Sequence, residues 1–161
     1  MAESGTPPDF KAMAELRYQI RCFLRFSENA ARAAGIEPQQ HQLLLAVKGL
    51  PDDLKPTIGV LAERMQLQHH SAVELIDRLV QRGLLCRLRA TDDRRQVLVK
   101  LTHDGEEFLQ KLALYHLQEW QSAGPKFVKL LQGLMRGAQA SSISNKTEET
   151  PTKKRKGTPH G

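Results

Sequence analysis

The 161-residue sequence lacks the features of membrane, secreted and metal-binding proteins. No stretch approaches the roughly 18 uninterrupted apolar residues of a membrane span. The N-terminus, MAESGTPPDF, has neither the basic start nor the apolar run of a secretory signal. Cys22 and Cys86 stand far apart and outside any Cys-x-x-Cys or Cys/His ligand spacing, so neither a disulfide framework nor a zinc site is expected. We therefore expect a cytoplasmic protein without a bound metal.

The sequence motifs of common nucleotide-binding and metal-dependent enzymes are also missing. Neither Gly-x-x-x-x-Gly-Lys-[Ser/Thr], Gly-x-Gly-x-x-Gly nor His-Glu-x-x-His occurs. The acidic pairs Asp52-Asp53 and Asp92-Asp93 fall in predicted loops without an acid or base partner. We therefore expect no catalytic activity and no cofactor.

Positive charge is what the sequence has in excess. Lys and Arg number 24 against 18 Asp and Glu, which gives a net charge of +6 and favours a polyanionic partner. Part of this excess lies in residues 138–161, a segment rich in Ser, Thr and Lys. Because this segment has little apolar surface to bury, we expect a disordered basic tail. Its basic run 153–156 is interpreted as solvated rather than as a nuclear-localisation signal, and residues 1–8 are expected to be a flexible N-terminus.

Helical periodicity marks the first part of the chain. Apolar residues recur at helical spacing over residues 9–34, and Gly35 follows as a left-handed terminus. A second helix is expected to begin at Pro38 and to end before the turn-rich segment 49–56.

Two further helices are predicted to lie close together. Thr57 can cap a short helix over residues 58–65, because its hydroxyl can accept from an early backbone amide. A break at 66–68 precedes a longer helix over 69–82, which ends at Gly83. Two helices so closely spaced predict a helix-turn-helix.

The period then changes to that of β-strands. Residues 84–90 and 96–101 are short strand-like runs, and the charged segment 91–95 joins them as a hairpin. Helical spacing returns from Thr102, and a break is expected at Gly124-Pro125 before a last apolar helix. The fold class is therefore mainly α with a small β-hairpin, in which a winged helix-turn-helix is flanked by N- and C-terminal helices.

The segment IGVLAERMQLQHHSAVELIDRLVQRGLLCRLRATDDRRQVLVKLTHDG carries a family resemblance. Its most specific parts are the Asp-x-Arg of Asp93–Arg95, the Val-x-Leu-Thr of Val99–Thr102, and Gly105. Over roughly residues 10–136 the chain resembles the MarR (multiple-antibiotic-resistance regulator) family of bacterial transcription factors. The resemblance implies a domain over residues 9–137, with a DNA-binding lobe at about 50–101 and dimerisation helices at 9–35 and 102–136.

The helix predicted over 69–82 has one apolar side and one polar side when residues advance by about 100° each. The apolar side is expected to face the core and comprises Ala72, Val73, Ile76, Leu79 and Val80. The polar side is expected to meet DNA in a major groove and comprises His70, Ser71, Glu74, Arg78 and Gln81. His69 is a further candidate for DNA contact. The alternatives are an ordinary solvated helix face and, for the two adjacent histidines, a metal pair.

The hairpin is expected to contact DNA as a wing. The resemblance implies that Arg95 inserts into a minor groove and that Asp93 orients the wing, while Arg94 is expected to meet a phosphate. Arg87 and Arg89 alternate along the first strand and could add contacts to the DNA backbone. The alternative is a charged turn that keeps an edge hairpin soluble.

Apolar stripes on the helices at both ends of the chain have no second core to fill. Pairing with a second copy would bury these stripes and place two recognition helices in successive major grooves. We therefore expect an obligate homodimer that binds a pseudo-palindromic operator, with repression as the commoner outcome for similar proteins.

The resemblance also implies a small-molecule effector pocket between the dimerisation helices and the winged helix. Residues near that junction by analogy are Tyr18, Cys22, Phe26, His41 and Leu45, and the alternative for each is plain helix packing. The position of Cys22 in the first helix is similar to that of an oxidised cysteine in hydroperoxide-sensing members, which leaves redox sensing open. A winged helix can also serve as a protein-docking module, although that role gives no reason for arginines at the hairpin tip.

Overall fold

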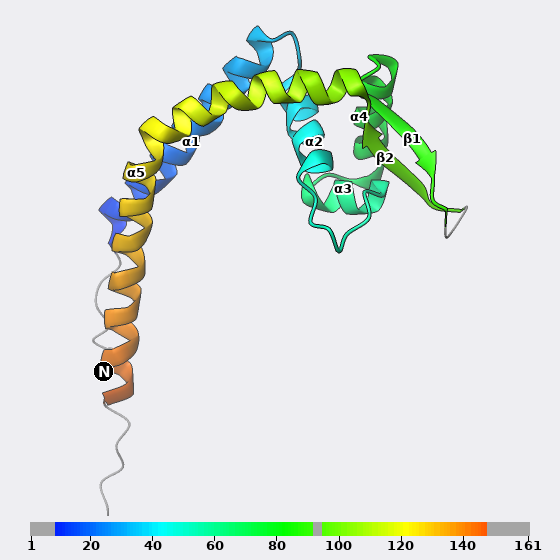
Figure 1. The fold of residues 1–161 in the computed structure, drawn as a ribbon. Coiled ribbons are helices and arrows are strands. Elements are labelled where there is room, and N and C mark those ends of the chain that lie inside the picture. Colours follow the sequence, from blue (N-terminus) through cyan, green and yellow to red (C-terminus); the bar gives the residue numbers. More distant parts are fainter. Residues whose placement is uncertain (1–8, 92–94, 148–161) are drawn as a thin grey trace, which may run out of the picture. The chain divides into compact units, whose positions relative to one another are not determined.

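The computed structural model describes residues 9–91 and 95–147, with side chains as far as Arg136. Within these residues the order is four helices, a two-stranded sheet and a long final helix (Figure 1). The elements are α1 (Phe10–Ala33), α2 (Pro38–Lys48), α3 (Ile58–Arg64), α4 (His69–Gln81), β1 (Leu85–Arg89), β2 (Val97–Leu101) and α5 (His103–Thr147). The predicted fold class, mainly α with one β-hairpin, is confirmed.

α1 ends and α2 begins near the positions that Gly35 and Pro38 predict. Gly35 has φ +77°, the left-handed conformation that glycine adopts without a Cβ penalty. Pro38 opens α2, and a capping box joins Glu37 to Gln40, whose Oε1 accepts from the Glu37 backbone N–H at 3.3 Å. The turn between the two helices is therefore set by residues that are neighbours in sequence.

Helices α3 and α4 form the predicted helix-turn-helix. Thr57 Oγ1 accepts from the Val60 backbone N–H at 3.3 Å and so caps α3. The turn between the helices passes through Gln66, a non-glycine residue at φ +52°, whose side chain donates to the Glu63 carbonyl at 2.8 Å. Gly83, at φ +71°, follows the end of α4.

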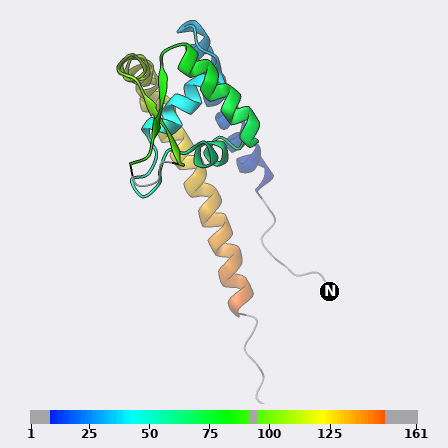
Figure 2. The same cartoon turned by 90° about the vertical axis from the view of Figure 1, so that its right-hand side faces the viewer.

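Strands β1 and β2 are antiparallel, with Leu85 opposite Leu101 and Arg89 opposite Val97. The segment just before α3 joins the edge of β2, because the Val99 backbone N–H donates to the Pro56 carbonyl at 2.8 Å. Helix α4 packs beside β1, as both views of the ribbon show (Figures 1 and 2). The hairpin is thus held to the helix-turn-helix at two places, as in a winged helix.

One apolar core unites the end of α1, the helices α2, α3 and α4, the hairpin and the beginning of α5. Its most deeply buried large side chains are Leu43, Leu44, Leu61, Ile76, Leu79, Leu85 and Val99. On α4, Ala72, Ile76 and Leu79 are buried as predicted, while Val73 and Val80 are half-buried. Leu75 is buried too, which the helical periodicity did not predict.

The break expected at Gly124-Pro125 is wrong, because α5 runs without interruption through Pro125. Proline removes one helical hydrogen bond, but long helical segments on both sides keep theirs. Lys126, the next residue, forms an ion pair with Glu15 of α1 at 3.1 Å. A hydrogen bond from Gln19 and this contact with Lys126 together lower the pKa of the Glu15 carboxyl.

The disordered tail was predicted from residue 138, but the helix α5 extends further, to Thr147. Residues 138–147 continue α5 as helix, because a helix already formed extends at low cost into residues that do not break it. Residues 148–161, the remainder of the predicted tail, lie outside the described part of the chain, as do the predicted flexible residues 1–8.

The chain divides into two compact units, residues 21–122 and residues 1–20 with 123–161. The first contains the core and the hairpin, and the second joins the beginning of α1 to the later part of α5. None of the helices in the described part of the chain is both long and apolar enough to span a bilayer.

Candidate DNA-binding surface

The outward face of α4 carries the side chains predicted to contact DNA. His69, His70, Glu74, Arg78 and Gln81 are exposed, and Ser71 is half-buried. Within the described residues, the N-cap residue Gln68 makes no side-chain capping hydrogen bond. The first turn of α4 therefore presents backbone amides that its N-cap side chain does not engage, beside two exposed imidazoles.

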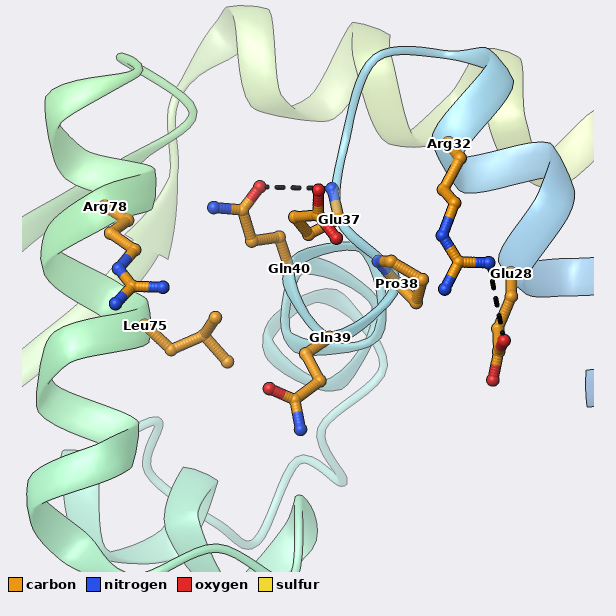
Figure 3. A pocket seen from close by; sticks show the side chains of 8 residues that line it. All are labelled: Glu28, Arg32, Glu37, Pro38, Gln39, Gln40, Leu75 and Arg78. Atoms are coloured by element: carbon orange, nitrogen blue, oxygen red, sulfur yellow. Dashed lines mark hydrogen bonds and ion pairs between the residues drawn. The ribbon is translucent and has the colours of Figure 1, made fainter.

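Arg78 and Glu74 lie one helical turn apart and form an ion pair, with Nη2 and Oε2 3.9 Å apart. Figure 3 shows the Arg78 guanidinium pointing from α4 into a pocket whose far side holds Glu28 and Arg32, themselves paired at 3.6 Å. Both arginines of this pocket thus have a carboxylate nearby, so the pocket does not concentrate positive charge.

The wing residues predicted to meet DNA differ in their surroundings. Arg87 of β1 is paired with Asp77 of α4, so its guanidinium holds the strand to α4. Arg89, two residues further along β1, is exposed, and Arg95 is exposed where the chain enters β2. Asp93 and Arg94, at the predicted tip of the wing, are outside the described residues.

Arg82 belongs to this surface although the sequence patterns did not predict a role for it. Its Nη1 donates to Gln40 Oε1 at 3.1 Å, and its Nη2 donates to the Gly35 carbonyl at 2.9 Å. These bonds tie the C-terminal end of α4 to the turn between α1 and α2. No local motif predicts them, because more than forty positions of sequence separate the partners.

A second joint holds the end of α4 to the beginning of α5. Thr102 Oγ1 donates to the Gly83 carbonyl at 2.6 Å and accepts from the Gly105 backbone N–H at 3.0 Å. A Cβ on Gly105 would lie only 2.0 Å from the Leu84 carbonyl oxygen, so only glycine fits this contact. Thr102 and Gly105 belong to the motif that carries the family resemblance, and this motif thus positions α5 against the turn that follows α4.

An apolar cavity of about 440 Å³ lies between α1, α2 and α5 within residues 21–122. Its apolar lining includes Phe23, Leu24, Leu45, Leu117 and Trp120, and its polar lining consists of Ser27, His41, Gln42 and His116. The structure thus brings His41 and Leu45, two of the predicted effector-pocket residues, into one cavity. Phe26, another of them, lines a neighbouring groove and stacks on Tyr115 at 5.3 Å between ring centroids.

The other two predicted pocket residues, Tyr18 and Cys22, are exposed on α1. Cys22 is a free cysteine that does not line this cavity. Redox sensing by Cys22 stays a hypothesis drawn from the family resemblance.

Large apolar side chains remain exposed on both flanking helices. In the unit formed by residues 1–20 with 123–161, Phe10 is 72% exposed and Met135 is 61% exposed. In residues 21–122 the side chains of Leu24, Leu114 and Leu117 are exposed as well.

A helix-turn-helix with an adjoining two-stranded wing, a polar outer face on its second helix and an arginine at the wing defines the winged helix-turn-helix class. Residues 34–96 match the model of the MarR family. This part of the chain is therefore a winged helix-turn-helix that is similar to that of the MarR family.

Individual relatives agree with this assignment. The uncharacterized HTH-type transcriptional regulator YhbI of Bacillus subtilis (strain 168) is 38% identical over 59 residues, which cover 37% of this chain and 38% of that protein. AbsC, a MarR family transcriptional regulator from Streptomyces coelicolor, superposes with a TM-score of 0.63 at 18% identity, over 92% of this chain and all of that one. A mutant of MepR from S. aureus bound to an oligodeoxyribonucleotide gives a TM-score of 0.58 at 15% identity, over 85% and 99% of the two chains. The structural likenesses show a shared fold.

Proposed function

We propose that this protein regulates transcription by binding a pseudo-palindromic DNA operator as a homodimer and that it represses the genes next to that operator. The observation that carries the proposal is the exposed polar face of α4 beside an arginine-bearing hairpin, within a segment that matches the MarR family. The MepR structure in complex with an oligodeoxyribonucleotide supports DNA as the partner of this fold.

In the proposed complex the outer face of α4 enters a major groove. His70 and Gln81 offer hydrogen-bonding groups to base edges, while Ser71 and the backbone amides of the first turn suit a phosphate. The ion pair with Arg78 offsets the negative charge of Glu74 and so lowers the repulsion that a lone carboxylate would meet near DNA.

The wing is proposed to contact the adjacent minor groove. A planar guanidinium suits the narrow, strongly negative minor groove of A·T-rich DNA. Arg95 is proposed to be the wing arginine that enters this groove. Arg89 and Arg94 would add phosphate contacts, and Asp93 would, by resemblance, orient the wing. Because Arg87 is paired with Asp77, we assign it to holding the wing rather than to contacting phosphate.

The dimer is proposed from the exposed apolar faces of α1 and α5. A second copy would cover side chains such as Phe10, Met135 and Leu117 and would place the two α4 helices one helical turn of DNA apart, roughly 34–36 Å. Analytical ultracentrifugation at micromolar concentration is expected to show a dimer, and a stable folded monomer would refute this part of the proposal.

Regulation is proposed to act through the cavity that contains His41 and Leu45. This cavity lies between α1, α2 and α5, and Arg82 and Thr102 link the neighbouring α1–α2 turn and α5 to the end of α4. A ligand that changes the arrangement of these helices would therefore change how α4 is held, and with it the affinity for DNA.

The DNA-binding proposal is tested by selecting sites from random duplexes and measuring fluorescence anisotropy over a range of salt. Arg95→Ala is expected to weaken binding to all duplexes and to flatten the salt dependence, since a cationic contact is lost. Gln81→Ala is expected to change the preferred sequence, each lost base contact being worth about 1–3 kcal/mol.

The matched control is Arg25→Ala, which removes the same charge from the exposed surface of α1. It is expected to retain the wild-type affinity and salt slope. Wild-type behaviour of Arg95→Ala would make the wing assignment wrong, and absence of binding to any duplex at low ionic strength would refute the function itself.

A further inference from the structure

Glu74 is a carboxylate on the face of α4 that is proposed to meet DNA. It lies one helical turn after His70 and one turn before Arg78, and its side chain is 67% exposed. A negative charge at this place repels phosphates and weakens the binding of any duplex. The other carboxylate of α4, Asp77, is paired with Arg87 of β1, so its charge is used within the protein. The effect of Glu74 therefore depends on which groups of the DNA it meets.

The ion pair between Glu74 and Arg78 leaves the carboxylate able to accept hydrogen bonds. Glu74 Oε2 lies 3.9 Å from Arg78 Nη2, which is too long for a hydrogen bond, and both side chains are 67% exposed. Within the described part of the chain, neither carboxylate oxygen has a hydrogen-bond donor. Exposed ion pairs of this kind typically contribute about 0–1 kcal/mol, so little is lost when the carboxylate turns to another donor.

The four bases differ in what they offer to a carboxylate in the major groove. A carboxylate only accepts hydrogen bonds, so it is repelled by the acceptors N7 and O6 of guanine and O4 of thymine. The donors are the amino groups of cytosine and adenine. The adenine amino group stands between two acceptors, its own N7 and the O4 of thymine, whereas the cytosine amino group has an acceptor on one side and a C–H group on the other. Cytosine is therefore the base that a carboxylate on α4 fits best.

We propose that Glu74 recognises a cytosine in each half-site of the operator, by accepting a hydrogen bond from its N4 amino group. This inference rests on the proposed function, because it requires the outer face of α4 to lie in a major groove. The same carboxylate is repelled by phosphates and by the acceptors of other bases, so Glu74 lowers the affinity for unrelated DNA more than the affinity for the operator. Glu74 thus contributes to specificity rather than to overall affinity.

Selection of sites from random duplexes tests which base Glu74 contacts. Wild type is expected to select C·G at a position that recurs in both half-sites, and Glu74→Ala is expected to lose the preference there while keeping it elsewhere. Glu74→Gln should instead select A·T at that position, because a glutamine side chain pairs with N6 and N7 of adenine. Selection of the same bases by wild type and Glu74→Ala would overturn the inference, and so would a Glu74-dependent position at which wild type selects a base pair other than C·G.

The hydrogen bond itself is tested with duplexes of the selected sequence that carry N4-methylcytosine at this position. The methyl group replaces the amino hydrogen that projects into the major groove, while the other hydrogen still pairs with guanine. Fluorescence anisotropy is expected to show that wild type binds the methylated duplex about tenfold more weakly, a difference of about 1.4 kcal/mol, whereas Glu74→Ala binds both duplexes equally. Equal weakening of the two proteins would overturn the assignment to Glu74.

Glu107→Ala is the matched control. Glu107 of α5 is an exposed carboxylate paired with Lys111, one helical turn further on, also at 3.9 Å, and it lies outside α4. Its removal should leave the selected bases unchanged, and a loss of preference at the same position would overturn the inference. Glu74→Ala should also bind an unrelated duplex at low salt about threefold more tightly, since one repulsion is removed.

The outcomes also separate this inference from the proposed function. Sequence-specific binding by wild type without a Glu74-dependent cytosine would refute the inference alone. Absence of binding to any duplex at low ionic strength would refute the proposed function as well.

Discussion

The winged helix and the two flanking helices differ in how far their apolar side chains are buried. Leu43, Leu61 and Val99 are completely buried by other parts of the same chain. In α1, all of whose residues are described, only Ala30 and Ala31 are buried, and Phe10 and Leu24 are exposed. The core of the winged helix is therefore closed within the single chain, with the end of α1 and the beginning of α5 contributing to it. The flanking helices also carry apolar side chains that the single chain leaves uncovered.

The two regions also differ in what connects them to α4. The winged-helix core holds α4 by apolar packing, together with the ion pair between Asp77 of α4 and Arg87 of β1. The turn before α2 and the beginning of α5 hold it by directed bonds, from Arg82 to the Gly35 carbonyl and from Thr102 to the Gly83 carbonyl. Directed bonds of this kind can be remade in a second arrangement more readily than close packing can.

The largest expected effect is at the contact between α5 and the α4–β1 turn. Gly105→Ala places a Cβ 2.0 Å from the Leu84 carbonyl oxygen, and we expect the free energy of unfolding to fall by about 4 kcal/mol. Urea denaturation measures this. Gly133→Ala, also in α5 but with no atom of the described residues within 4 Å of the added Cβ, should instead stabilise by about 0.5–1 kcal/mol. Equal effects of the two substitutions would contradict the packing described.

The next effect is the pH dependence contributed by His41. Its pKa of about 4 in the folded state, against an ordinary value of 6.5, means that the unfolded chain binds the proton more readily. The corresponding stability is fully present above pH 6.5 and is lost as the pH falls towards 4, about 3 kcal/mol in total. Denaturation of wild type and His41→Phe across this range measures it, and parallel curves for the two proteins would refute the assignment.

Breaking the apolar face of the flanking helices should separate the dimer without harming the winged helix. Met135→Glu puts a charge on a side chain that is exposed in the single chain. We expect the dimer dissociation constant to rise about a hundredfold, or roughly 2.7 kcal/mol, as measured by sedimentation equilibrium. Leu88→Glu, at an exposed apolar position of the wing, is the control and should leave the dimer intact.

The smallest effect tests the bonds that tie α4 to the α1–α2 turn. Arg82→Ala removes the hydrogen bonds to Gln40 and to the Gly35 carbonyl, and we expect a loss of about 1 kcal/mol in unfolding free energy. Thermal denaturation measures that loss. DNA affinity should fall further than stability predicts, because α4 is then less well positioned. Arg82→Lys can restore only one of the two bonds, so its unfolding free energy should lie between those of the wild type and Arg82→Ala.

Elements whose signals are local follow from the order of the amino acids alone. Gly35, Thr57 and Gly83 mark helix ends through their own backbone or hydroxyl groups, and the change of period after Gly83 locates the hairpin. The outer face of α4 follows from helical geometry, so its candidate recognition residues can be named from their spacing along the chain.

Features that depend on partners distant in sequence arise only on folding. α5 continues through Pro125 because proline removes only one backbone hydrogen bond. Rules based on neighbouring residues do not take account of the hydrogen bonds that the helix keeps on either side. The bonds from Arg82, the pairing of Arg87 with Asp77, and the stacked His41 and His116 join separate elements. Burial and partner together set the role of these side chains, and both exist only once the chain has folded.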